Sequence, residues 1–102
     1  MREFVGTGYL YALDATYAQL VQAFGEPNGE VYGNKTDAEW HLGLNGVVFT
    51  IYNYKDGHNF KGEAGLPVQS ITRWNVGGRN RSAVLVEIVK ALTAKEQQEW
   101  VR

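Results

Sequence analysis

The sequence of 102 residues contains no cysteine. This absence excludes disulfide bonds, thiolate metal ligands and a cysteine nucleophile. The sequence also contains no run of 18 apolar residues, so we expect no helix that spans a membrane. The residues that follow Met1 do not form the long apolar stretch of a secretory signal. We therefore expect a cytoplasmic protein.

The chain also lacks a strong excess of charge. Ten lysine and arginine residues stand against eleven acidic ones, which gives a formal net charge of −1. A general nucleic-acid binder owes most of its affinity to a basic surface that neutralises phosphates. General nucleic-acid binding is therefore not expected, although a local basic patch is still allowed.

The segment 17–24 predicts a short helix. Its apolar residues recur at helical spacing and form one stripe. Thr16 precedes the segment and Gln19 is its third residue, which is the spacing of a capping box. Asp14 is a rival cap. Gly25 stands where a helix needs a left-handed stop.

Residues 40–51 predict a β-hairpin with a defined register. Asn45-Gly46 suits a two-residue turn, because both residues tolerate positive φ. This turn places six large apolar side chains on one face, as the period of two requires. The predicted cross-strand pairs are Leu44 with Val47, Leu42 with Phe49, and Trp40 with Ile51. The opposite face would carry Glu39, His41, Thr50, Tyr52 and Tyr54, and would be only partly covered.

Two further strands are predicted. In residues 9–13, Tyr9, Tyr11 and Leu13 would share one face, and residues 71–76 form the other strand. A long connection with regularly spaced glycines runs from Lys55 to Gln69. Loops of this length are often functional or mobile.

The C-terminal part predicts a helix over 82–92 and a short helix over 94–101, because Thr93 and Glu96 repeat the capping-box spacing. The whole chain, 1–102, is then one α+β domain. We expect a small antiparallel sheet of three to four strands with two main helices packed on one face. The order is β-α-β-β-β-α plus the short C-terminal helix, with sequential strands as neighbours.

The helix expected over 82–92 is apolar on more than one side. Its inward stripe would consist of Val84, Leu85, Ile88, Val89 and Leu92, and Val86 adds to it. The surplus predicts a contact with a second copy, hence a homo-oligomer, because small domains often gain core in this way. Trp100 would serve the same contact. The alternative is a helix buried between the sheet and the C-terminal tail.

The turn between the last strand and this helix is the strongest candidate for a binding site. It combines two glycines with polar and basic side chains: Gly77, Gly78, Arg79, Asn80, Arg81 and Ser82. Glycines let a ligand approach the backbone, and helix N–H groups and guanidinium groups donate to an anion. The alternative is an ordinary turn capped by Asn80 or Ser82. The pattern matches neither a Walker loop nor a dinucleotide fingerprint.

Three aromatic residues on neighbouring predicted strands could add flat surfaces to this site. Tyr52, Tyr54 and Trp74 could stack on a base or a sugar ring. The alternative is ordinary strand packing, where aromatic residues are common. We favour packing for Trp74 and leave both interpretations open for Tyr52 and Tyr54.

No grouping of residues predicts catalysis or a metal site. The two histidines, His41 and His58, lack the spacing of metal-binding motifs. The sequence contains no Gly-x-Ser-x-Gly motif, and Ser70 and Ser82 have no evident base. We therefore expect no metal, no cofactor and no enzyme, with a small hydrolase as the least favoured function.

Four sequence segments resemble accessory proteins of tailed bacteriophages, a group without an assigned activity. They are Phe24-Gly25-Glu26-Pro27, Glu39-Trp40-His41-Leu42, Ile51-Tyr52-Asn53-Tyr54-Lys55 and Trp74-Asn75-Val76-Gly77-Gly78. The resemblance implies no role for any residue. It implies a setting in the host-cell cytoplasm, where small accessory phage proteins often bind and disable host factors and some sequester nucleotide signals of host immunity.

These observations lead to two hypotheses about function. In the first, the chain is a non-enzymatic binding protein that takes an anionic small molecule, such as a nucleotide-type signal, at the Gly77-Gly78 turn. Arg79 and Arg81 would pair with phosphate or carboxylate, and this binding would counter host defence. In the second, the chain inhibits a host protein through the face of the hairpin and the connection 55–69.

Overall fold

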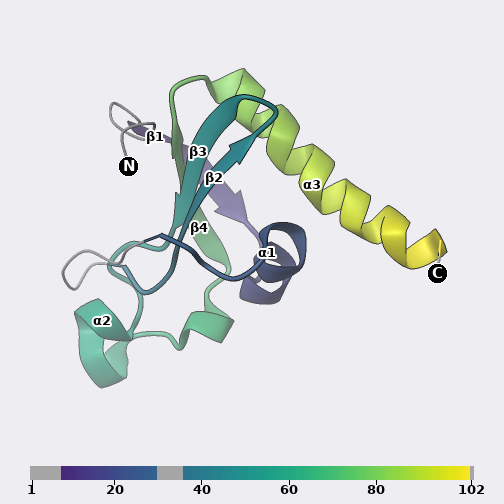
Figure 1. The fold of residues 1–102 in the computed structure, drawn as a ribbon. Helices are drawn as coiled ribbons and strands as arrows, with labels where there is room; N and C mark the ends of the chain where they lie inside the picture. Colours follow the sequence, from purple (N-terminus) through teal and green to yellow (C-terminus); the bar gives the residue numbers. More distant parts are fainter. Residues whose placement is uncertain (1–7, 30–35, 102) are drawn as a thin grey trace.

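The computed structural model describes residues 8–29 and 36–101 of the chain, with side chains up to residue 93. It contains a four-stranded antiparallel sheet in the spatial order β1-β4-β3-β2 (Figure 1). The strands are β1 (Gly8–Asp14), β2 (Glu39–Leu44), β3 (Val47–Tyr52) and β4 (Arg73–Gly78). This arrangement confirms the predicted α+β fold. The N-terminal strand pairs with β4 and not with its neighbour in sequence, so only β2, β3 and β4 are sequential neighbours.

Helix α1 (Tyr17–Phe24) forms where its sequence signals predict it. The Thr16 hydroxyl accepts a hydrogen bond from the Gln19 N–H at 3.0 Å, and Gln19 Oε1 accepts one from the Thr16 N–H at 2.8 Å. This reciprocal pair is the predicted capping box. Gly25 follows with φ of +84°, a conformation that glycine adopts at little cost. Its carbonyl accepts a hydrogen bond from Trp40 Nε1 at 2.8 Å, which ties the end of the helix to β2.

The hairpin of β2 and β3 has the predicted register. Trp40 pairs with Ile51, Leu42 with Phe49, and Leu44 with Val47. Asn45 and Gly46 both have positive φ, 52° and 79°, as the two-residue turn requires. The alternation of side chains therefore places the six paired apolar residues toward the core.

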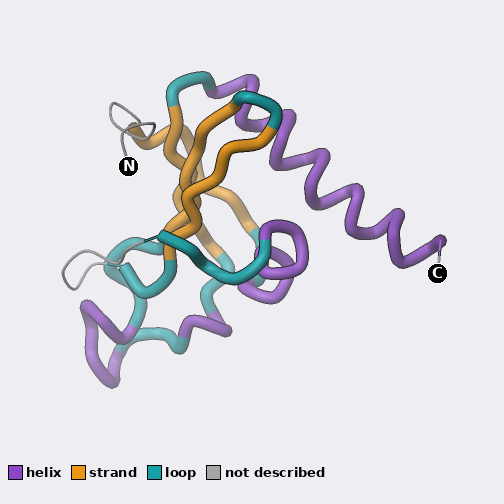
Figure 2. Tube along the Cα trace, viewed as in Figure 1, coloured by secondary structure: helices purple, strands orange, loops and turns teal. Residues whose placement is uncertain are grey.

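The core lies between one face of the sheet and the helices α1 and α3 (Arg81–Val101), as Figure 2 shows. Two tryptophans form its centre: the rings of Trp40 and Trp74 meet edge to face, with centroids 5.4 Å apart. Trp74 Nε1 donates to the Ala15 carbonyl at 3.0 Å, so its polar atom is satisfied inside the core. Trp74 is thus a packing residue. In the described part of the chain, no helix is long and apolar enough to cross a bilayer.

Strand β1 differs from the prediction because it contains a bulge. The pairing register shifts between Tyr9 and Tyr11, so Leu10 is an extra residue opposite β4. As a result Tyr9 is 60% exposed, whereas Leu10, Tyr11 and Leu13 pack against the core. The prediction that Tyr9 shares a face with Tyr11 and Leu13 was therefore wrong.

The C-terminal helix also differs from the prediction. Helix α3 continues without a break through Thr93, where two separate helices were expected. The capping-box spacing of Thr93 and Glu96 does not end a helix by itself, and no glycine or proline follows Gly78. Val84 and Ile88 are buried as predicted, but Leu85 and Val89 are exposed. The predicted contact of Trp100 lies outside the described side chains.

The predicted long connection between β3 and β4 contains short helical turns. These are α2 (His58–Lys61) and two 3-10 turns, Gly62–Ala64 and Val68–Ser70. Strand β4 begins two residues later than predicted and extends through both glycines to Gly78.

Candidate functional site

The two glycines of the predicted anion site lie inside the sheet. Gly77 pairs with Tyr9 on one side and Thr50 on the other, and Gly78 pairs with Gly8 and Phe49. Both are buried. The expected glycine corner is therefore a continuation of β4, and the turn itself consists of Arg79 and Asn80.

Close packing explains why glycine stands at both positions. A Cβ at Gly77 would lie 2.8 Å from Thr50 Oγ1. A Cβ at Gly78 would lie 3.1 Å from both Leu10 Cδ1 and Val84 Cγ2. Glycine in a strand interior often marks such close approach. Here it lets the bulge of β1 and the first turn of α3 meet over β4.

Asn80 and Arg81 also make internal contacts. Asn80 Oδ1 accepts a hydrogen bond from the Ala83 N–H at 3.1 Å, which is the N-cap of α3 that the alternative interpretation expected. Arg81 Nη1 donates to the Leu10 carbonyl at 2.8 Å, and its guanidinium lies 5.1 Å from the centroid of the Tyr11 ring. Arg81 thus fastens α3 to the bulge of β1.

A small pocket lies beside this turn. It has a volume of about 210 Å³ and is lined by the hairpin turn and the start of α3: Gly46, Val47, Val48, Arg79, Asn80 and Ala83. Ligand pockets usually have roughly 300–1,000 Å³. The pocket is therefore small, but it places Arg79 next to apolar side chains.

The predicted tyrosines do not join this site. Tyr52 pairs with Asn75, three residues before Gly78, and Tyr54 follows the same end of β3. Arg79 and Asn80 follow the opposite end of β4, where the hairpin turn and the start of α3 meet (Figure 1). At about 3.3 Å per strand residue, roughly 10 Å of β4 separates Asn75 from Gly78. The predicted constellation is thus divided between two ends of the sheet.

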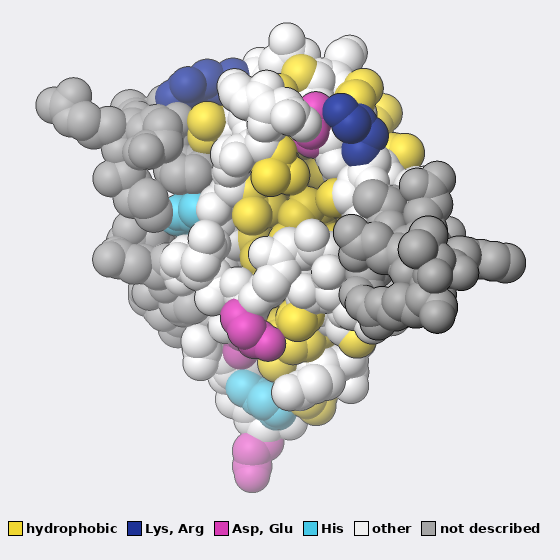
Figure 3. Space-filling view, turned by 45° about the vertical axis from the view of Figure 1, so that its right-hand side comes forward, with side chains coloured by type: hydrophobic (Ala, Val, Ile, Leu, Met, Phe, Trp, Pro, Cys, Tyr) yellow, Lys and Arg dark blue, Asp and Glu magenta, His cyan; other side chains and the backbone are white. Residues whose placement is uncertain are grey.

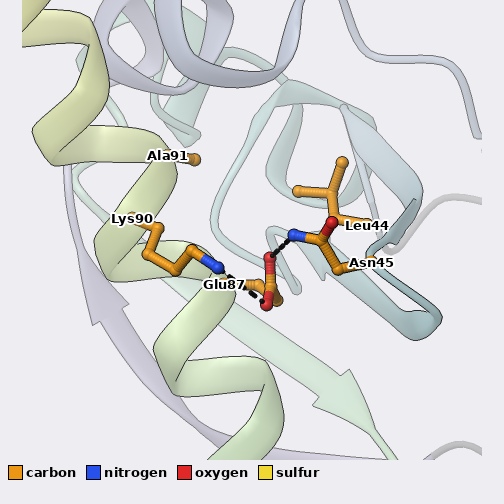
Figure 4. Close-up of a pocket in the computed structure, with 5 residues that line it drawn as sticks. All are labelled: Leu44, Asn45, Glu87, Lys90 and Ala91. Carbon is orange, nitrogen blue, oxygen red and sulfur yellow. Dashed lines mark hydrogen bonds and ion pairs between the residues drawn. The ribbon is translucent and has the colours of Figure 1, made fainter.

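A second pocket, of about 220 Å³, lies between the hairpin turn and α3 and is drawn in Figure 4. Asn45 Nδ2 donates to Glu87 Oε1 at 2.8 Å, and Lys90 Nζ lies 3.6 Å from Glu87 Oε2. The Glu87 side chain is 9% exposed, and these partners compensate its burial. The contacts fasten the hairpin to α3.

Figure 3 shows hydrophobic side chains gathered in the middle of one face of the molecule, with acidic and basic side chains near its upper edge.

A buried asparagine organises the segment after β3, and sequence analysis missed it. Asn53 is fully buried. Its Oδ1 accepts hydrogen bonds from the N–H groups of Asp37 (2.6 Å) and Ala38 (3.1 Å). Its Nδ2 donates to Asp37 Oδ1 (3.0 Å) and Asp56 Oδ1 (2.9 Å). All four hydrogen-bonding positions of the amide are thus occupied, which holds the start of β2 against the end of β3.

The same network fixes the start of α2. Asp37 Oδ2 accepts a hydrogen bond from the Asn59 N–H at 3.1 Å. A Cβ at Gly57 would collide with the Asp37 carboxylate at 2.1 Å. Asn59 Nδ2 donates to the Thr36 carbonyl at 2.9 Å. The loop is therefore held by side chains from both sides of the hairpin.

An exposed surface of aromatic and basic side chains lies on this loop. Tyr54 is 47% exposed and Phe60 is 42% exposed. Lys55 Nζ lies 5.2 Å from the centroid of the Tyr54 ring and 5.4 Å from that of Phe60, within cation–π distance of both. Leu66 is 46% exposed, and its N–H donates to the carbonyl of Asp56, the residue after Lys55. We call Tyr54, Lys55, Phe60 and Leu66 the 54–66 surface.

Tyr52 connects this surface to the sheet. Burial raises the pKa of Tyr52 above its ordinary value, and the neighbouring Glu39, Tyr9 and Tyr54 raise it further. Glu39 Oε1 lies 3.1 Å from His41 Nε2.

The two histidines lie apart and contact different groups. His41 faces Glu39, and His58 Nδ1 lies 2.6 Å from the Gly62 carbonyl. Among the described side chains, no group of three histidine or acidic residues could hold a metal ion. Both histidines thus contact other groups of the chain.

Comparison with protein-family models, with curated proteins and with solved structures found no match for this chain.

Proposed function

We propose that this chain is a non-catalytic accessory protein of phage type that binds a host protein through the 54–66 surface. The observation that carries the proposal is the position of the Lys55 ammonium group between two exposed aromatic rings. Aromatic residues dominate the binding energy of protein interfaces.

The local backbone supports this proposal. Lys55 has φ of +64°, which a residue with a side chain adopts only at a cost of about 1–3 kcal/mol when its surroundings enforce it. The surroundings here are the hydrogen bonds of Asn53 to Asp37 and Asp56. A binding surface held in advance loses less conformational entropy on association.

The composition of the 54–66 surface favours a protein partner. Two aromatic rings and a leucine offer apolar area, and Lys55 offers one positive charge. Tyr52, which pairs with Asn75, extends this area onto the neighbouring end of the sheet. A partner with a carboxylate beside an apolar side chain would satisfy both features.

The test is capture from a bacterial lysate with three forms of the protein. The parent is expected to retain one protein in stoichiometric amount, and the Tyr54→Ala/Phe60→Ala variant is expected to lose it. Arg79→Ala is the matched control, because Arg79 lies at the opposite end of the sheet. Equal capture by all three forms, or none by the parent, would contradict the proposal.

A second candidate is binding of an anionic small molecule in the pocket beside Arg79 and Asn80. The observation that favours it is the pocket of about 210 Å³ that these residues line with Gly46, Val47 and Val48. Arg79 would supply the guanidinium group, and the apolar residues would contact a ring.

Calorimetry with a panel of nucleotides separates this candidate from the first. The parent is expected to release heat, and Arg79→Ala is expected to release none. Arg81 is left unchanged because it fastens α3 to β1. No heat from the parent, or equal heat from both, would reject the candidate.

A further inference from the structure

The sequence contains the dipeptide Asn-Gly twice, and the two copies have different surroundings. One is Asn28-Gly29, which follows α1, and the other is Asn45-Gly46, the turn of the hairpin. An asparagine before a glycine loses its side-chain amide when the glycine backbone nitrogen attacks it, and glycine has no Cβ to hinder this approach. The two copies therefore share one reactive group, and their surroundings decide which of them reacts.

The edge of β2 holds the first copy. Asn28 Nδ2 donates to the His41 carbonyl at 3.1 Å, and Asn28 Oδ1 accepts from the His41 N–H at 2.7 Å. The Gly29 N–H donates to the Glu39 carbonyl at 2.9 Å, so the nitrogen that would attack is itself fixed. A Cβ at Gly29 would lie 2.6 Å from His41 Cδ2, so this backbone packs closely against the ring. Attack at Asn28 would therefore require these three hydrogen bonds to break together.

The second copy lacks these restraints. Asn45 and Gly46 lie outside both strands of the hairpin and are exposed. Within residues 8–29 and 36–101, the Gly46 N–H meets no hydrogen-bond acceptor. Within the same ranges, the Asn45 side chain makes one hydrogen bond, from Nδ2 to Glu87 Oε1 at 2.8 Å. The attacking nitrogen is therefore unprotected, and rotation of the Asn45 side chain breaks one contact.

We propose that Asn45 is a site of spontaneous deamidation in the folded protein, whereas Asn28 is protected. The Gly46 nitrogen attacks Asn45 Cγ and forms a cyclic imide. The bond from Cγ to Nδ2 breaks, and Nδ2 leaves as ammonia together with the proton of the Gly46 N–H. Water then opens the imide at either carbonyl carbon. Opening at the side-chain carbonyl leaves aspartate, and opening at the main-chain carbonyl leaves isoaspartate, in which the chain continues through Cγ.

The product changes the contact between the hairpin and α3 that Figure 4 shows. The Glu87 side chain is 9% exposed, and its second partner, Lys90 Nζ, lies 3.6 Å away on a side chain that is 61% exposed. After deamidation, position 45 carries a carboxylate, so the donor to Glu87 becomes a second negative charge, and like charges repel. Isoaspartate also adds a backbone atom to a turn that requires two residues. Deamidation therefore releases the hairpin from α3.

The first test is peptide mapping by mass spectrometry after incubation of the protein at mildly alkaline pH. In the folded protein, Asn45 is expected to convert about tenfold or more faster than Asn28, because the hydrogen bonds of the first copy must break before it reacts. In urea the two copies are expected to convert at equal rates, so Asn28 is a control within the same chain. Equal rates in the folded protein, or no conversion of Asn45, would overturn the proposal. A difference that persists in urea would assign the effect to the neighbouring sequence and would overturn it too.

The second test measures the consequence with variants that carry the product. Asn45→Asp is expected to lower the urea midpoint of unfolding. Asn45→Asp/Glu87→Gln is expected to regain most of this loss, because the new amide donates to the new carboxylate. Glu87→Gln alone is the control, because it keeps an oxygen that accepts from Asn45 Nδ2. An unchanged midpoint in Asn45→Asp, or no recovery in the double variant, would contradict the release of the hairpin from α3.

Discussion

The two ends of β4 differ in how they use their polar residues. At the β4–α3 turn, Asn80 caps a helix and Arg81 binds the Leu10 carbonyl, so a pattern typical of an anion site holds the fold together. At the other end, the buried Asn53 amide makes four hydrogen bonds to Asp37, Ala38 and Asp56. The residues that follow it in the loop, Tyr54, Lys55 and Phe60, are exposed. Similar polar residues thus fix a turn at one end of the strand, and at the other end they hold a segment whose apolar side chains are exposed. It is this exposed segment that we propose as the binding surface.

The largest effect is expected from the buried amide of Asn53. Asn53→Ala leaves the Ala38 N–H and the Asp37 N–H without their acceptor, and each unsatisfied buried group costs about 1–3 kcal/mol. We expect the free energy of unfolding to fall by about 2–5 kcal/mol in urea denaturation. Asn59→Ala, which removes one part-buried hydrogen bond, is the control and should cost about 1 kcal/mol. Equal losses would mean that Asn53 does not organise the loop.

The next effect is expected at the opposite end of the strand. In Gly78→Ala the new methyl group meets Leu10 and Val84 at 3.1 Å, and such overpacking costs about 1–3 kcal/mol. Gly43→Ala in β2 is the matched control, because nothing lies within 4 Å of its Cβ position. Its stability should change by about 0.5 kcal/mol or less. If both substitutions are equally mild, the packing explanation of Gly78 fails.

A smaller effect is expected from the cap of α3. Asn80→Ala removes the acceptor of the Ala83 N–H, which costs about 1 kcal/mol for a typical N-cap. Asn80→Asp keeps an oxygen in the same place and should restore most of this stability, because a carboxylate also suits a helix N-terminus. Thermal unfolding monitored by circular dichroism gives both values. Full stability of Asn80→Ala would indicate that the cap is unimportant and would favour a ligand role for Asn80.

The smallest effect is expected from Tyr52 and appears only at high pH. Its pKa is raised above 10.0, first by burial and then by Glu39 and the neighbouring tyrosines. The folded state therefore holds this proton longer than the unfolded state, so stability is full below pH about 10 and is lost as pH rises through the folded pKa. In Tyr52→Phe the fall of stability above pH about 10 should be shallower. An unchanged slope would mean that Tyr52 titrates as in the unfolded chain.

The features that could be predicted from the sequence are those whose causes lie close together in the chain. The capping box of Thr16 and Gln19 and the turn at Asn45-Gly46 depend on residues at most three positions apart, and both formed as predicted. The alternation of the hairpin then settled which side chains enter the core.

The features that were missed depend on contacts between distant segments. Arg81 meets Leu10 across 71 positions, and Asn53 meets Asp37 across 16. The bulge at Leu10 explains both the exposure of Tyr9 and the need for glycine at position 78. No local pattern indicates a bulge or a buried amide, so glycines that serve packing were interpreted as a ligand cradle.

The most direct test of the account is hydrogen exchange of backbone amides with and without the captured partner. If the partner binds the 54–66 surface, binding slows exchange in residues 54–66 and leaves exchange in residues 79–83 unchanged. Slower exchange in 79–83 with no change in 54–66 would contradict it and would return the binding site to the β4–α3 turn.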